Sequence, residues 1–106
     1  MNIKTNSSKS DIAISGLYNV IDPEIGLNIV DLGLVYQIDF NEDDKEIIVT
    51  MTLTTQFCPM GDSIVSAATQ AIQQLFSEYK IQVDLTFDPH WDASMISEEG
   101  NRFLNY

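Results

Sequence analysis

Residues 35–53 read VYQIDFNEDDKEIIVTMTL, in which two strand-like segments flank a run of turn-forming residues. The segment 35–40 alternates, and it places Val35, Gln37 and Asp39 on one face and Tyr36, Ile38 and Phe40 on the other. The segment 47–53 is rich in β-branched residues, which favour strands. Because the loop 41–45 between them is short, the two strands can pair only antiparallel. The stretch therefore predicts a β-hairpin.

Helical patterns lie on both sides of this hairpin. Ahead of it, Ser10 or Asp11 can cap a helix that ends near Ile21, because the residue before Pro23 avoids the helical region. The apolar stripe of this first helix is Ile14, Leu17, Tyr18 and Ile21. After the hairpin, a long helix is predicted over about 62–79, with a stripe of Ile64, Ala68, Ala71, Ile72, Leu75, Phe76 and Tyr79. The segment 27–34 fits neither a helix nor a strand.

Two further elements complete the predicted order. The segment 81–87 alternates and predicts a strand with one covered face, and a short helix runs from Ser97 to about Leu104. The order helix, strand, strand, helix, strand, short helix predicts an α+β fold, with helices packed on one face of a small mixed sheet. We expect residues 1–9 to form a flexible tail and residues 10–106 to form a single domain.

The composition excludes several classes of function. Sixteen acidic residues against five basic ones give a net charge of -11, which disfavours nucleic acid and anionic membranes as partners. No apolar run is long enough to cross a membrane, and the polar N-terminus does not resemble a secretory signal. With one cysteine and one histidine, the chain cannot build a closed zinc site from Cys and His ligands. A single cysteine also fits a reducing cytoplasm.

Cys58 is the first candidate for chemistry. It lies between a predicted strand and the start of the long helix, and Thr54 and Thr55 precede it in the same loop. Free N–H groups and partial positive charge at a helix start stabilise a thiolate and lower the pKa of a thiol. The alternative is that Cys58 is a small buried apolar residue, which is common for a free cysteine.

Two turns hold the remaining candidates. Asp22 and Glu24 flank Pro23, and such a pair of carboxylates can transfer protons or bind a hard cation. Alternatively, both are solvated turn residues, with Asp22 capping the chain reversal. His90 and Trp91 follow the last predicted strand. We interpret His90 as a surface residue and Trp91 as a lid on the core rather than a binding platform.

Three blocks of sequence resemble those of the PaaD/SufT-type family of metal–sulfur cluster assembly proteins, and they occur in the family's order. The first is DPE at 22–24 followed by NIVDLGLVY at 28–36, and the second is MTLTT at 51–55 followed by Cys58-Pro59. The third is Asp88-Pro89, Trp91 and MISEEG at 95–100. The family's proline after the second threonine is replaced by Gln56. The extra C-terminal cysteines of PaaD are missing, so the chain is more similar to SufT.

The resemblance implies a cytoplasmic accessory factor that assembles iron–sulfur clusters or transfers them to client proteins. In the family, the cysteine of the second block is the reactive one, which is Cys58 here. The acidic pair and the two threonines are thought to gather around it, and these correspond to Asp22, Glu24, Thr54 and Thr55. The expected partners are the iron–sulfur assembly machinery and client apoproteins.

Three alternatives remain open from the sequence. One cysteine cannot hold a cluster alone, so Cys58 either shares a transient cluster with a second chain or a client, or never holds metal. We expect no stably bound cofactor and keep a homodimer as an option. The other readings are a thiol-dependent enzyme with Cys58 as nucleophile and an interaction scaffold with an inert cysteine, and a non-catalytic assembly factor is the preferred one.

Overall fold

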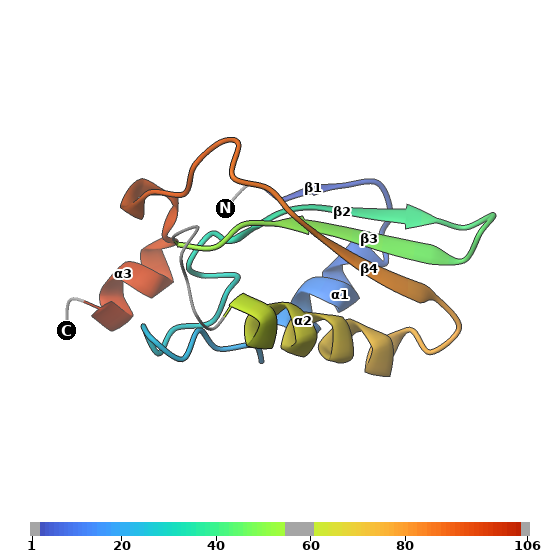
Figure 1. The fold of residues 1–106 in the computed structure, drawn as a ribbon, viewed down its shortest axis with the longest axis horizontal. Helices are drawn as coiled ribbons and strands as arrows, with labels where there is room; N and C mark the ends of the chain where they lie inside the picture. Colours follow the sequence, from blue (N-terminus) through green and yellow to red (C-terminus); the bar gives the residue numbers. More distant parts are fainter. Residues whose placement is uncertain (1–2, 55–60, 105–106) are drawn as a thin grey trace.

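A four-stranded mixed sheet forms the centre of the molecule (Figure 1). The computed structural model describes residues 3–54 and 61–104, and all structural statements concern these residues. The strands lie in the order β1-β2-β3-β4, with bounds Lys4–Thr5, Val35–Asn41, Glu46–Met51 and Lys80–Leu85. β2 and β3 are antiparallel, whereas β1 pairs parallel with β2 and β4 pairs parallel with β3. The predicted hairpin and mixed sheet are confirmed.

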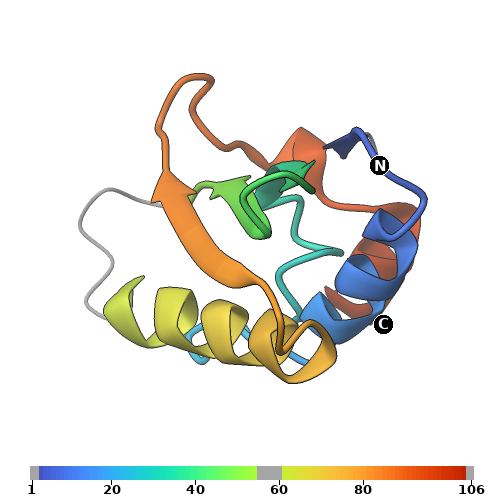
Figure 2. The same ribbon diagram turned by 90° about the vertical axis from the view of Figure 1, so that its right-hand side faces the viewer.

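Helices α1 (Ser10–Leu17) and α2 (Gly61–Leu75) cover one face of this sheet (Figures 1 and 2). α2 buries Ile64, Ala68 and Ile72, three members of its predicted stripe. It ends at Leu75 rather than near residue 79, and Leu75, which the stripe predicted as buried, is 46% exposed. The last helix, α3 (Glu98–Leu104), lies at one end of the sheet, and a short 3-10 helix, η1 (Ala93–Met95), precedes it. The arrangement confirms the predicted α+β class. It places the core between the sheet and the two longer helices.

A β-bulge corrects the predicted faces of β2. The pairing with β3 shifts between Val35 and Gln37, so Tyr36 is an extra residue in the ladder. Val35 is consequently buried on the same side as Ile38 and Phe40, and it does not share a face with Gln37 as the alternation predicted. An extra residue in one strand inverts the alternation beyond it, which a strict two-residue period cannot anticipate.

The first helix is shorter than predicted. α1 ends at Leu17 rather than near Ile21, and Tyr18 and Ile21 of the predicted stripe are 40% and 49% exposed. Ala13 and Gly16 are buried instead, because Gly16 allows α1 to approach α2 closely. A Cβ atom at Gly16 would lie 2.7 Å from Cδ1 of Leu75. Small residues, which an apolar stripe overlooks, therefore form this contact.

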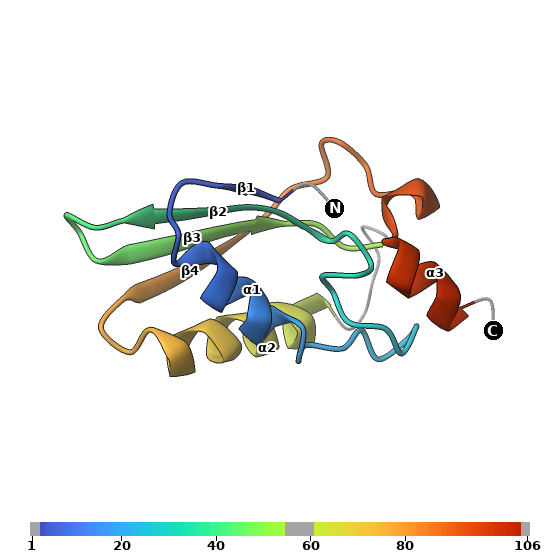
Figure 3. The same cartoon turned by 180° about the vertical axis from the view of Figure 1, so that it is seen from behind.

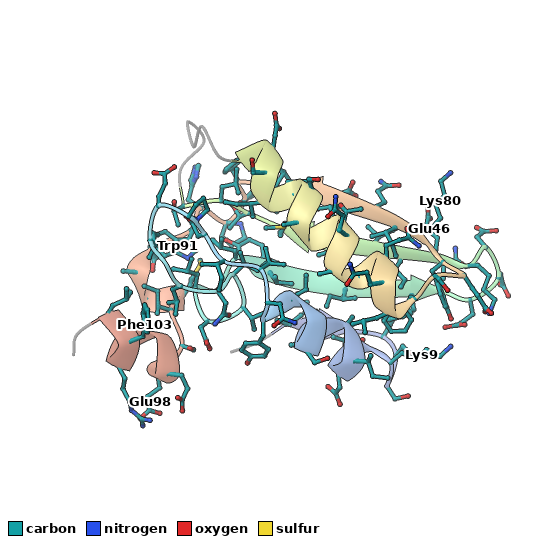
Figure 4. All side chains as sticks on the ribbon, turned by 90° about the horizontal axis from the view of Figure 1, so that it is seen from below. Lys9, Glu46, Lys80, Trp91, Glu98 and Phe103 are labelled. Carbon is teal, nitrogen blue, oxygen red and sulfur yellow. The ribbon has the colours of Figure 1, made fainter. Side chains whose placement is uncertain are left out.

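The N-terminal segment contacts the sheet at two points. The sequence predicts residues 1–9 as a flexible tail, but β1, which lies within them, pairs with β2. Lys9 (labelled in Figure 4) donates hydrogen bonds to the Glu42 carboxylate at 3.2 Å and to the Tyr79 hydroxyl at 2.8 Å. The Tyr79 hydroxyl in turn donates to Glu42 at 2.7 Å. This network joins the start of α1 to the β2–β3 hairpin.

The segment 18–34, between α1 and β2, contains turns and one isolated bridge between Ile21 and Asn28. It is nevertheless part of the core, because Leu27, Ile29, Val30, Leu32 and Leu34 are buried. Burial without regular structure explains why residues 27–34 match neither sequence template. In the described residues, no helix is long and apolar enough to cross a membrane.

Candidate functional site

The acidic turn is built around Asp22, which is only 1% exposed. Its Oδ1 accepts a 2.9 Å hydrogen bond from the backbone N–H of Glu24, and its backbone carbonyl accepts one from Gly26 at 2.7 Å. Gly26 has a φ of 83°, a left-handed conformation that glycine adopts without strain. Asp22 therefore caps the chain reversal, as the alternative interpretation expected, but it is buried rather than solvated, whereas Glu24 is exposed.

The threonine and cysteine candidates lie between β3 and α2. Thr54 is half-buried directly after the buried Leu53. α2 begins against Leu53, since a Cβ atom at Gly61 would lie 2.8 Å from its Cδ1. Thr55 and Cys58 lie outside the described residues. The structure therefore shows where the connection leaves Thr54 and where it enters α2 at Gly61, and both residues lie in the chain between these points.

The segments that carry the candidate residues lie at one end of the sheet. The segment 18–34, the C-terminal end of β3 and the N-terminal end of α2 lie at the end that α3 also occupies (Figures 1 and 3). A 2.8 Å hydrogen bond from the Thr52 N–H to the Leu34 carbonyl joins the chain after β3 to this segment. Two separate sequence blocks, the acidic turn and the residues that follow β3, thus reach the same end of the molecule.

The first and third sequence blocks are joined by a network centred on Asp31. Its carboxylate accepts hydrogen bonds from the Asn28 amide and from the Ser97 hydroxyl, both at 2.7 Å. The Ser97 oxygen also accepts from the Gly100 N–H at 3.0 Å, and Ser97 thereby caps α3. Sequence reasoning assigned no role to Asn28 or Asp31. The Asn-x-x-Asp spacing, in which an amide side chain can bond a backbone N–H three residues on, was the available signal.

Three more contacts join the first and third sequence blocks. Trp91 Nε1 donates a 2.7 Å hydrogen bond to the Leu32 carbonyl, and the Tyr36 hydroxyl donates one of 2.9 Å to the Pro89 carbonyl. Burial raises the pKa of Tyr36. Gly33, with a φ of 80°, passes so close to Met95 that a Cβ atom would overlap the Met95 carbonyl. We call these paired segments, 27–36 and 88–100, the C-terminal clasp.

Residues of the C-terminal clasp that make internal hydrogen bonds have a structural role, which distinguishes them from the candidates for chemistry. The polar side chains of Asp31, Tyr36, Trp91 and Ser97 make hydrogen bonds within the chain, and the candidates for chemistry are still Asp22, Glu24, Thr54, Thr55 and Cys58. His90 is exposed, as expected from the sequence, and Trp91 is a partly buried lid on the core. Among residues 3–54 and 61–104, no group of three Asp, Glu, His or Cys residues is placed to hold a metal ion.

Two hollows flank Tyr36 rather than the acidic turn. One, of about 440 Å³, lies between Gly33 and the segment 94–98, and the other, of about 370 Å³, opens between Lys4 and Asp88. Neither is lined by Asp22, Glu24 or Thr54. The described candidates, Asp22, Glu24 and Thr54, therefore lie outside these two hollows.

Comparison with known proteins decides the family. Residues 13–86 match the model of the family described as iron-sulfur cluster assembly protein. The chain belongs to this family. The matched residues include the acidic turn and the connection between β3 and α2, so the match covers the first two of the three sequence blocks and confirms the family resemblance.

One relative of this iron–sulfur cluster assembly family member aligns along its whole length. It is 38% identical to an Fe-S protein maturation auxiliary factor from Porphyromonas gingivalis, over 100% of this chain and 99% of the relative. It is 39% identical to the Fe-S protein maturation auxiliary factor SufT from Staphylococcus aureus, over 74% of this chain and 88% of that one. A Bacillus anthracis domain of unknown function has the same fold, with a TM-score of 0.84, 33% identity and 90% coverage of both chains.

Proposed function

We propose that this protein is an accessory factor in the maturation of iron–sulfur proteins, and that Cys58 is its working residue. The observation that carries the proposal is the family match over residues 13–86, together with a relative named as a maturation auxiliary factor that aligns along the full chain. These support the role in cluster assembly. The part played by individual residues is inferred from chemistry.

Coordination chemistry favours transient handling of a cluster over storage. Iron–sulfur clusters are held by several thiolates, and this chain has one cysteine. Cys58 can therefore complete a cluster's ligand set only together with thiolates of a client, an assembly protein or a second chain. We infer that an iron–sulfur cluster is cargo passed through this protein in the cytoplasm, and that the purified monomer is colourless and poor in iron.

The acidic turn holds the two carboxylates that we infer belong to the site. The backbone hydrogen bond from Glu24 fixes the Asp22 carboxylate, and Glu24 projects from the same turn. Carboxylate oxygens are hard ligands that bind iron more weakly than a thiolate binds it in a cluster. We infer that Asp22, Glu24, Thr54 and Thr55 shape the surroundings of Cys58 and help release the cluster, whereas Cys58 is the ligand to iron.

A capture experiment tests this proposal. Tagged wild-type protein, Cys58→Ser and Asp22→Asn are purified from cells under anaerobic conditions, and iron, sulfide and co-purifying proteins are measured. Wild type should retain client or assembly proteins and substoichiometric iron and sulfide. Cys58→Ser should lose the metal, because a hydroxyl is a far poorer ligand for a soft metal than a thiolate. Ser63→Ala, at an exposed position near the start of α2, is the control.

The outcomes separate the three readings of Cys58. Iron and sulfide that persist in Cys58→Ser would exclude this residue as the ligand. Partners that bind wild type and Cys58→Ser equally, without metal in either, would indicate a scaffold with an inert cysteine. A thiol enzyme would instead form a covalent adduct on Cys58 during turnover, which mass spectrometry of the intact protein detects.

A further inference from the structure

β4 forms one edge of the sheet, and its outer side faces away from the other strands (Figure 2). It pairs only with β3, in a parallel register that matches Glu46 with Lys80 and Met51 with Leu85. Among the described residues, no segment pairs with its outer side. The opposite edge, β1, is two residues long and offers little backbone for pairing.

Two hydrogen bonds fix which backbone groups of β4 point outward. The N–H of Lys80 donates to the Lys45 carbonyl at 2.7 Å, and the N–H of Thr86 donates to the Met51 carbonyl at 2.9 Å. In a parallel pair, the residues that bond the neighbouring strand alternate along the chain. The even-numbered residues of β4 therefore bond to β3, and the N–H and C=O groups of Ile81, Val83 and Leu85 point toward the free edge.

The side chains of β4 follow the same alternation. Ile81 and Val83 are packed against the core on the helix side. Lys80, Gln82 and Asp84 are exposed on the other face of the sheet, which the helices do not cover (Lys80 is labelled in Figure 4). A positive residue therefore lies two positions before Gln82, and a negative residue lies two positions after it.

We propose that β4 pairs antiparallel with β4 of a second copy of this chain, on a twofold axis through Gln82. In this register Ile81 faces Val83 of the other copy, and each such pair exchanges two backbone hydrogen bonds between outward groups. Lys80 faces Asp84 of the other copy on both sides of the axis. Side chains of residues at such non-hydrogen-bonded positions approach to about 4.5–5.5 Å between Cβ atoms, within reach of an ion pair.

Neighbouring registers lack this complementarity. A shift by a single residue would pair outward backbone groups with inward ones and lose the hydrogen bonds. An axis through Val83 places Asp84 opposite Gln82 and leaves both charges unpaired. An axis through Ile81 places Asp84 opposite Glu78, a like charge that is unfavourable. The sequence KIQVDL of β4 thus selects one pairing with itself.

The net charge of -11 on each copy opposes association. The pairing also adds only a short strand to each sheet. We therefore expect a reversible dimer that forms as protein concentration rises. Moderate salt should favour it, because screening reduces the overall repulsion between two acidic molecules more than it weakens close pairs.

This dimer is independent of the proposed handling of a cluster. Met51 is paired with Leu85, three residues from the axis, so the two Met51 ends would lie about 20 Å apart along the strands at about 3.3 Å per residue. The described ends of β3 in the two copies, after which the candidate residues follow in the chain, therefore lie toward opposite ends of the extended sheet. Loss of dimerisation and loss of cluster handling are consequently separable results.

Charge reversal tests the proposal in the full chain. Sedimentation velocity over a wide concentration range should show a monomer–dimer equilibrium for wild type. Lys80→Asp and Asp84→Lys should each weaken dimerisation by about tenfold or more, because two attractive pairs become two repulsive ones. The double variant Lys80→Asp/Asp84→Lys exchanges the charges and should restore the wild-type constant.

A matched control distinguishes the pairing from a general charge effect. Lys4→Asp makes the same change in net charge at an exposed residue on the opposite edge of the sheet, and it should leave dimerisation within about twofold of wild type once screened by salt. Wild type that stays monomeric at every concentration would overturn the proposal. So would a double variant that remains as weak as the single ones, or a Lys4→Asp variant as weak as Lys80→Asp.

Amide hydrogen exchange locates the interface directly. The N–H groups of Ile81 and Val83 face outward and should exchange more slowly as the protein concentration rises. The N–H groups of Lys80 and Thr86 already bond to the chain at β3, and their exchange should change little. Concentration-dependent protection elsewhere, with none at Ile81 and Val83, would assign the dimer to another surface and overturn the proposal.

Discussion

The indole Nε1 of Trp91 donates a 2.7 Å hydrogen bond to the carbonyl oxygen of Leu32, 59 residues earlier in the chain. Leu32 is fully buried, and its segment contains neither helix nor strand that could satisfy this carbonyl. Trp91, in the third sequence block, thus supplies the hydrogen-bond donor that a buried carbonyl of the first block needs. Trp91 therefore has a structural role, which is to satisfy a buried carbonyl of a segment far from it in the sequence.

Trp91→Phe should remove this hydrogen bond while an aromatic ring still covers the core. A buried carbonyl without a partner costs about 1–3 kcal/mol, so the free energy of unfolding should fall by that amount. Urea denaturation measures it. Phe103→Leu, at a residue 53% exposed, should stay within about 0.5 kcal/mol of wild type. An equally small effect of Trp91→Phe would mean that water replaces the indole.

The two glycines with positive φ offer a matched pair. Gly26→Ala should cost about 1–2 kcal/mol for the left-handed backbone alone, because no atom lies within 4 Å of the new Cβ. Gly33→Ala has a similar φ and also overlaps the Met95 carbonyl, so it should cost several kcal/mol more than Gly26→Ala. Thermal unfolding of both variants checks this. Equal losses would contradict a close backbone approach in the C-terminal clasp.

Asp22 should contribute to stability as well as to the proposed site. Asp22→Ala removes the acceptor for the Glu24 N–H and should cost about 1 kcal/mol. Asp22→Asn keeps an oxygen in the same position and should cost less, so it separates the charge from the hydrogen bond. Chemical denaturation measures both variants, with exposed Asp43→Ala as the control. A larger loss for Asn than for Ala would contradict this assignment.

The Lys9–Glu42–Tyr79 network predicts a dependence of stability on pH. Hydrogen bonds from Tyr79 and Lys9 lower the pKa of Glu42. A carboxylate with a lowered pKa stabilises the fold above the pKa of about 4.3 that it has when unfolded, and the contribution is lost as the pH falls through its folded pKa. Glu42→Gln should therefore lower the unfolding midpoint at pH 7, and the difference from wild type should shrink in acid.

Lys9 sets the upper pH limit of the stability that the same network contributes. Hydrogen bonds to Tyr79 and Glu42 raise the pKa of Lys9. Its contribution to stability is therefore complete below the pKa of about 10.4 that it has when unfolded and is lost as the pH rises through its folded pKa. A Glu42→Gln difference that stayed constant from pH 3 to pH 7 would contradict the assignment.

The sequence alone was sufficient for the elements with a clear period. The alternation of β2, the β-branched residues of β3 and the apolar stripe of α2 each predict their element, because local periodicity expresses which face is buried. The three sequence blocks identified the family and the candidate residues before the fold was known. The positions of Thr55 and Cys58, outside the described residues, remain predictions.

Tertiary structure decided what local patterns cannot encode. The bulge at Tyr36 inverts the faces of β2, and the close approach of α1 to α2 at Gly16 replaces apolar side chains with a glycine contact. The buried state of Asp22 and the bonds of Asp31 and Leu32 to Ser97 and Trp91 join residues that are far apart in the sequence. Such contacts arise only once the chain has packed, because a buried polar group must find its partner in three dimensions rather than at a fixed spacing along the chain.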